Sequence, residues 1–88
     1  MNGKSMRFQA KVQVWLRPGI ADPEGHTVFE AIHALGYSGI AGVRMGKIIS
    51  LDVEADSKES AEKRVSEIAT SLLSNPVLED VEIQINEA

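Results

Sequence analysis

The side chains that could do chemistry are few, and their spacing does not bring them together as a catalytic set. The 88 residues include two histidines and no cysteine, which excludes disulfides, thiolate metal sites and cysteine nucleophiles. His26 and His33 fall on one side of an expected helix, about 10 Å apart by helical rise, too far to share a metal ion. Glu30 is the only carboxylate near His26 on that side. We therefore expect both histidines to be exposed helix residues.

The acidic pairs and the glycines also have structural explanations. Asp22 and Glu24 stand at a helix start, where carboxylates cap free amides and complement the helix dipole. Asp52 and Glu54 share one face of an expected strand, about 7 Å apart, with no neighbouring base in sequence. The glycines at 36, 39, 42 and 46 match neither a phosphate-binding loop nor a dinucleotide fingerprint. Turn formation accounts for them.

One short segment, Arg44-Met45-Gly46-Lys47, combines charge with an approachable backbone. Its two cations bracket a glycine, at which another molecule can come close to the main chain. The segment could bind an anion or an acidic patch on a partner. A solvated cationic turn is the equally simple alternative.

Charge and hydropathy limit the classes of partner that the chain could bind. The formal net charge of −4 argues against nucleic acid, which attracts basic surfaces. The charge is polarised: residues 1–47 carry a balance of +3 and residues 48–88 a balance of −7. Such a chain could self-associate or dock on a charged partner, or its charges could simply solvate its surface. No apolar run approaches the roughly 18 residues that cross a bilayer, so we expect no membrane contact and a cytoplasmic location.

The pattern along the chain predicts a disordered leader over residues 1–6 and one domain over 7–88. Residues 7–17 alternate as a strand, and a helix is expected over 23–35 between an Asp-Pro start and a glycine stop. Residues 40–55 read as two strands joined by a turn at 45–47. A capping box beginning at Asp56 opens a second helix to about residue 73, and residues 81–86 form the last strand.

This order, β-α-β-β-α-β, predicts an α+β class and a ferredoxin-like two-layer sandwich. Two helices with one apolar stripe each would cover one face of an antiparallel sheet. The other face would be polar, yet would carry Trp15 in the middle of a strand. Aromatic residues dominate interface energetics, so we expect self-association or partner docking through this open face.

Five motifs, in order, resemble one known family. The motifs are KVQVWLRPG at 11–19, DPEG at 22–25, ALGY at 34–37, VRMGK at 43–47 and NPVLED at 75–80. With them, the chain resembles the PurS-type small subunit of phosphoribosylformylglycinamidine synthase from about residue 7 to 86. Val81 departs from the pattern, because an aromatic residue is expected there.

The resemblance implies a subunit with no catalytic residues and no cofactor of its own. It would be a homodimer or tetramer that links a glutaminase subunit to a large synthetase subunit and supports ammonia transfer in purine biosynthesis. ATP and Mg²⁺ would bind the large subunit. The resemblance and the open face together suggest the following candidates for contacts between subunits: Trp15, Asp22, Pro23, Gly25, Arg44, Gly46 and Lys47.

A second hypothesis is that the chain is a regulatory module that binds a small ligand. Small ferredoxin-like domains often bind amino acids between a strand–helix loop and a dimer partner, and residues 18–25 occupy that junction. A regulatory module should gain thermal stability with a small ligand, and an assembly subunit should not. A small acid–base enzyme using His33 or Asp52 is the third possibility.

Overall fold

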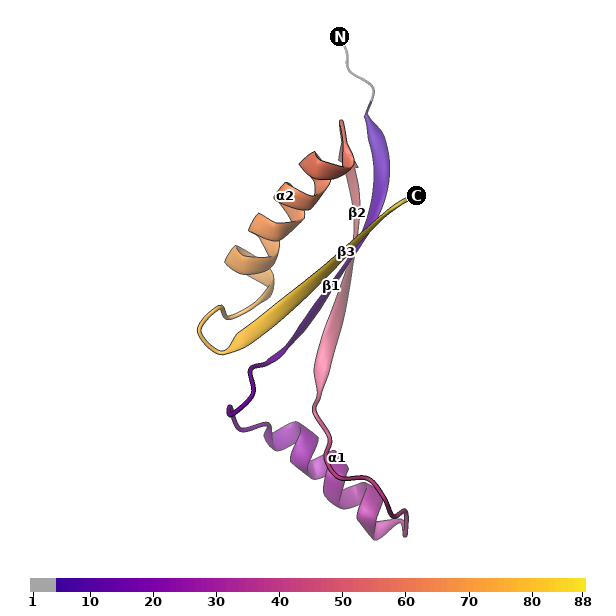
Figure 1. The fold of residues 1–88 in the computed structure, drawn as a ribbon, viewed down its shortest axis with the longest axis vertical. Helices are drawn as coiled ribbons and strands as arrows, with labels where there is room; N and C mark the ends of the chain where they lie inside the picture. Colours follow the sequence, from indigo (N-terminus) through magenta and orange to yellow (C-terminus); the bar gives the residue numbers. More distant parts are fainter. Residues whose placement is uncertain (1–4) are drawn as a thin grey trace.

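The computed structural model describes residues 5–88 as one sheet, one helix packed on it, and one helix that projects beyond its end (Figure 1). The elements are β1 (Met6–Leu16), α1 (Pro23–Ala34), β2 (Gly46–Ala55), α2 (Lys58–Ile68), a π-helical turn η1 (Ala69–Leu73) and β3 (Glu79–Glu87). The predicted leader falls mostly on residues outside the described range. Met6, which was assigned to it, is the first residue of β1 and pairs with Ala55.

The sheet has three antiparallel strands in the order β2-β1-β3, so β1 is central and the other two strands are its edges. Strict alternation along β1 directs Phe8, Ala10, Val12 and Val14 to one face, where each is at most 2% exposed. Val12 stands opposite Ile49 on β2 and Ile83 on β3. Apolar side chains on all three strands therefore form the inner layer of the core.

Helix α2 forms the second layer. Ala61, Val65 and Ala69 are fully buried and belong to the same cluster as the inward side chains of the sheet. The helix starts at Ser57, whose hydroxyl accepts a hydrogen bond from Ser60 N at 3.1 Å. The predicted cap at Asp56 was therefore one residue too early. Because η1 continues the helix, its predicted end near residue 73 is confirmed.

The α+β class and the two-layer sandwich are confirmed, but two details of the predicted fold are wrong. The observed order is β-α-β-α-β, since residues 40–45 form no strand. The reason is the register: Gly46 pairs with Trp15, the next-to-last residue of β1. The residues before Gly46 therefore run past the end of β1, the neighbour of β2 in the described sheet.

The second correction concerns α1, which does not share the covered face with α2. It extends beyond the end of the sheet, and residues 37–45 run back beside it to β2 (Figure 1). We call residues 23–45 the arm. Within the arm, Tyr37 N donates to Ile32 O at 3.4 Å and the His33 ring lies 3.3 Å from Ile40 O. Phe29 of α1 and Val43 of the return segment line the same pocket, so part of the apolar surface of the helix faces that segment.

The projecting arm makes the molecule long. Its principal extents are 61 × 26 × 15 Å and its radius of gyration is 17.4 Å, against about 12 Å expected for a compact chain of this length. Large apolar side chains are exposed near the tip of the arm, with Leu35 76% and Tyr37 66% exposed. No helix of the described residues is both long and apolar enough to cross a membrane.

Candidate functional site

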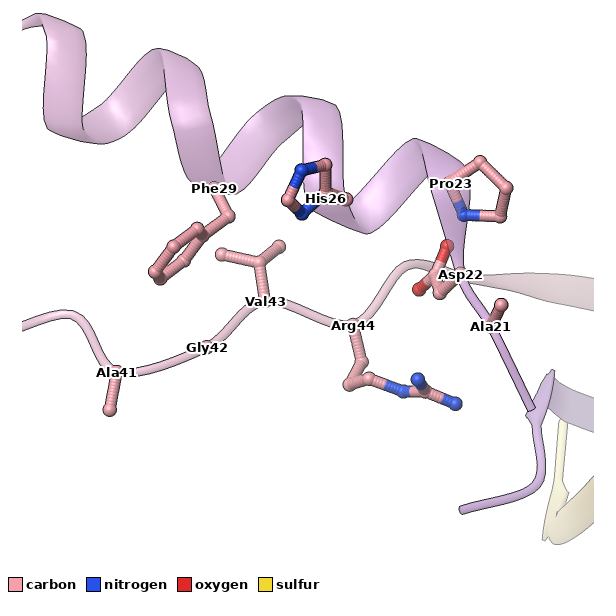
Figure 2. Close-up of a pocket in the computed structure, with 9 residues that line it drawn as sticks. All are labelled: Ala21, Asp22, Pro23, His26, Phe29, Ala41, Gly42, Val43 and Arg44. Atoms are coloured by element: carbon pink, nitrogen blue, oxygen red, sulfur yellow. The ribbon is translucent and has the colours of Figure 1, made fainter. Parts of the chain in front are cut away.

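The seven residues suggested as contact candidates all lie where the arm meets the sheet. Asp22, Pro23 and Arg44 line a pocket of about 540 Å³ between α1 and its return segment, together with His26, Phe29 and Val43 (Figure 2). A smaller hollow of about 270 Å³ on the sheet side is lined in part by Trp15, Asp22, Gly46 and Lys47. Gly25 lies in the first turn of α1, beside Asp22. Sequence reasoning thus selected residues that the fold gathers into one region.

Asp22 joins the two chain segments that connect the arm to the sheet. One carboxylate oxygen accepts a hydrogen bond from Gly25 N at 2.9 Å, which caps α1 as the Asp-Pro motif predicts. The other accepts one from Met45 N at 2.8 Å, on the segment that returns to β2. These two bonds, that from Met45 first, lower the pKa of the Asp22 carboxyl below its ordinary value, and the nearby Arg44 charge adds to the effect.

Arg44 makes the reciprocal connection, from the returning segment to the end of β1. Its guanidinium donates to three backbone oxygens, those of Leu16, Arg17 and Ile20, each at 3.1 Å. The planar fork of arginine suits this arrangement, because several N–H groups can reach neighbouring carbonyls at once. Although Arg44 was selected as a cation for a partner, its donors hold the chain's own turn.

Gly25 and Gly46 are both required by close approach of other atoms. A Cβ at Gly25 would lie 2.7 Å from Val43 O and 2.6 Å from a carboxylate oxygen of Asp22, so α1 could not sit against the return segment. A Cβ at Gly46 would lie 2.9 Å from Val14 O. Steric need within the chain therefore explains both glycines, whether or not they also touch a partner.

Trp15 and Lys47 remain available to another molecule. Trp15 is half-buried on the open face of the sheet, opposite Gly46 on one side and Asp80 on the other. Lys47 is exposed, and within residues 5–88 its side chain has no hydrogen bond or ion pair. Of the two cations in the turn, Lys47 is thus the one free to meet an acidic partner.

The residues weighed for acid–base chemistry stay apart. His26 lies 3.5 Å from Glu30, and both side chains are about two-thirds exposed, at 68% and 70%. The His33 ring is 4.5 Å from that of Phe29 and also contacts Ile40 O. Asp52 faces Gln9 across the sheet, and Glu54 pairs with Arg7 at 3.1 Å. In the part of the chain that the structure describes, no three His, Asp or Glu side chains gather as a metal site.

Two features of this region are not evident in the sequence. The first is the projection of the arm, for which the irregular, glycine-containing stretch at residues 38–44 was the available signal. The second is the attachment of β3 to the end of β1 through Arg17, which bonds Pro76 O and lies 3.2 Å from Asp80. The distribution of charged residues along the sequence does not indicate that Arg17 and Asp80 pair, because the two residues are far apart in the chain.

Comparison with known proteins agrees with this arrangement. The family model PurS, described as phosphoribosylformylglycinamidine (FGAM) synthase, matches residues 9–87. The PurS subunit of Archaeoglobus fulgidus is 38% identical over 84% of this chain and 92% of the relative. That of Mycobacterium leprae is 42% identical over 82% and 87%.

Solved structures show the same fold. The purS subunit of Thermotoga maritima superposes with a TM-score of 0.85 at 32% identity, covering 94% of this chain and 95% of that one. A chain in the structure of PurLQS from the same organism gives 0.84 at 32% identity, with 91% and 98% covered. The chain therefore belongs to the PurS family of phosphoribosylformylglycinamidine synthase.

Proposed function

We propose that this chain is the non-catalytic assembly subunit of a phosphoribosylformylglycinamidine synthase, linking a glutaminase subunit to a large ATP-dependent synthetase subunit. In this role it supports transfer of ammonia from the first active site to the second, in purine biosynthesis. Membership of the PurS family and the likeness to a chain of PurLQS support the assignment. A relative from Methanocaldococcus jannaschii is described as one of the subunits of an amidotransferase in the purine biosynthetic pathway.

The observation that carries the proposal is the elongated shape with two separate surfaces. One is the open face of the sheet around Trp15, and the other is the tip of the arm around Leu35 and Tyr37. A monomer of this size exposes such large apolar groups at a cost, which contact with other chains offsets. Two surfaces some distance apart let one small chain touch two others, as a linking subunit requires.

Some of the partners are copies of the chain itself. A homodimer or tetramer would cover part of the exposed apolar surface while leaving the rest for the glutaminase and the synthetase. The chain would need no cofactor of its own, with ATP and Mg²⁺ held by the large subunit. We place the assembled enzyme in the cytoplasm, where its soluble substrates would be found.

The test is reconstitution of the synthase with and without this chain. Formation of the amidine is measured with glutamine and, separately, with ammonium as the nitrogen source. We expect the chain to be needed for the glutamine-dependent reaction and much less for the ammonium-dependent one. Equal rates with and without the chain, for both nitrogen sources, would contradict the assignment.

A ligand-binding regulatory module is the alternative, and the 540 Å³ pocket lies at the junction where that reading places a ligand. Its two charged groups are already engaged, Asp22 by two backbone N–H groups and Arg44 by three carbonyl oxygens. Thermal melting with glutamine and with Mg-ATP separates the readings. A regulatory ligand at 100 times its Kd would add about 2.7 kcal/mol of stability, and an assembly subunit should show no shift.

A further inference from the structure

In the part of the chain that the structure describes, Figure 1 shows the arm meeting the sheet where the chain leaves β1 and re-enters β2. Residues 17–22 lead out and residue 45 leads back. Two connecting segments that lie so close together would act as a hinge between the arm and the sheet unless other bonds held them in place. A few residues between two structural bodies are sufficient to absorb a large change of angle.

Asp22 and Arg44 join these connections in both directions. The Asp22 carboxylate, on the outgoing segment, accepts the N–H of Met45 on the returning segment at 2.8 Å. The Arg44 guanidinium, on the returning segment, donates at 3.1 Å to each of Leu16 O, Arg17 O and Ile20 O on the outgoing side. Hydrogen bonds that involve an ionised group are about twice as strong as neutral ones, and all four are of this kind.

We propose that Asp22 and Arg44 form a brace that locks this hinge, so that the arm and the open face of the sheet act as one rigid unit. Both residues are then positioning residues: they present the surfaces around Tyr37 and Trp15 at a fixed spacing, without either side chain having to touch a partner. Gly25 completes the brace, because its lack of a Cβ lets α1 lie against Val43 O. The consequence for assembly rests on the proposed function, whereas the brace is a property of this chain alone.

The brace can be tested by measuring the spacing of arm and sheet directly. The sequence has no cysteine, so two introduced cysteines are the only labelling sites. Spin labels at Ala34→Cys on the arm and Glu62→Cys on α2 both occupy exposed helix positions. Dipolar spectroscopy on labelled chain diluted into excess unlabelled chain then reports distances within a single molecule.

Asp22→Asn is the decisive variant. Asparagine caps a helix as well as aspartate does, so α1 keeps its bond from Gly25 N, while the amide cannot also accept from Met45 N. Arg44→Gln removes the other half of the brace. Glu24→Gln and Lys47→Gln are the matched controls, since each removes one charge beside the brace without removing any of its four hydrogen bonds.

We expect a single narrow distance distribution in the parent chain and in both controls, and a broader, shifted one in Asp22→Asn and Arg44→Gln. Circular dichroism and melting should show the sheet intact in all of them. If Arg44→Gln does not fold, Asp22→Asn alone decides the matter. An unchanged narrow distribution in folded Asp22→Asn would overturn the proposal. Because neither the glutaminase nor the synthetase subunit is present, this outcome is independent of the reconstitution assay.

Discussion

Gly25 of α1 lies so close to the carbonyl oxygen of Val43 that a Cβ on the glycine would be 2.7 Å from it. The first turn of the helix and the return segment therefore depend on one another for their placement. This contact lies outside the core formed by the sheet and α2, so changes to it should affect the arm without unfolding the rest.

Gly25→Ala should loosen the arm. Overpacking of a close contact costs about 1–3 kcal/mol, and here the cost falls on the ordering of α1. Hydrogen exchange measures it as faster exchange of the α1 amides with unchanged protection in β1. Gly42→Ala is the control, because nothing lies within 4 Å of a Cβ at that position. Equal protection of the α1 amides in the two variants would show that the contact between Gly25 and Val43 does not determine how well α1 is ordered.

Phe8→Ala should destabilise the sheet and α2 strongly. Phe8 is fully buried, and truncation of a buried phenylalanine to alanine costs about 3–5 kcal/mol. Urea unfolding at low protein concentration measures the change. Leu35→Ala, at a side chain 76% exposed, should stay within about 0.5 kcal/mol of the parent. A comparable loss in both variants would mean that the arm contributes to the same core.

Lys47→Glu should weaken assembly and leave the fold unchanged. Lys47 is exposed, and charge reversal there removes a cation from the surface without breaking an internal bond in the described chain. Arg44→Glu is expected to fold and to weaken assembly too, but through loss of three backbone contacts as well as of charge. Co-elution with the partner subunits and melting curves separate the two effects. Assembly of Lys47→Glu at wild-type affinity would remove that charge from the interface.

Lowering the pH should weaken the part of the brace that Asp22 makes with Met45. The pKa of Asp22 is lowered in the folded chain, so its stabilising contribution is fully present above the ordinary pKa of an aspartate and is lost as the pH falls through the lower pKa of the folded chain. The amide signals of Gly25 and Met45 should shift together in this acidic range in an NMR titration. In Asp22→Asn, which has no carboxylate at residue 22, the two amide signals should not show this shift. Independent shifts of the two amides in the parent chain would argue against a shared carboxylate.

Trp15 should report on contact with the open face. It is the only tryptophan of the sequence and is half-buried in the described chain. If copies associate through this face, its emission should move to shorter wavelength as concentration rises, because the ring leaves water. Trp15→Ala should then weaken association, since truncation of an aromatic hot spot in an interface costs about 2 kcal/mol or more. Association with no change in emission would place the interface elsewhere.

The parts of the fold that depend on local pattern were predictable. The alternation of Phe8, Val12 and Val14 identified β1 as a strand, and the Asp22-Pro23 start and Gly36 stop identified α1. Gly36 indeed adopts a positive φ of 91°. These features follow from side-chain period and capping chemistry within a few residues, so no knowledge of the distant chain is needed.

The position of the arm was not predictable in the same way. An apolar stripe on α1 signals that the helix covers something, and the sheet was the natural choice, but Figure 1 shows it beside its own return segment. The residues of the site were predicted, but the contacts that each of them makes were not. Arg44 was selected as a surface cation, and only the three-dimensional structure shows its guanidinium bonded to Leu16 O, Arg17 O and Ile20 O.

The extended shape also affects how the chain moves through solution. A particle of 61 × 26 × 15 Å experiences more friction than a sphere of the same 9.6 kDa. Its Stokes radius is correspondingly large, and a single copy elutes from a sizing column ahead of a compact protein of equal mass. The mass inferred from the elution volume is therefore too high, and so is the number of copies calculated from it. Light scattering measures the mass itself, which does not depend on friction, and gives the number of copies directly.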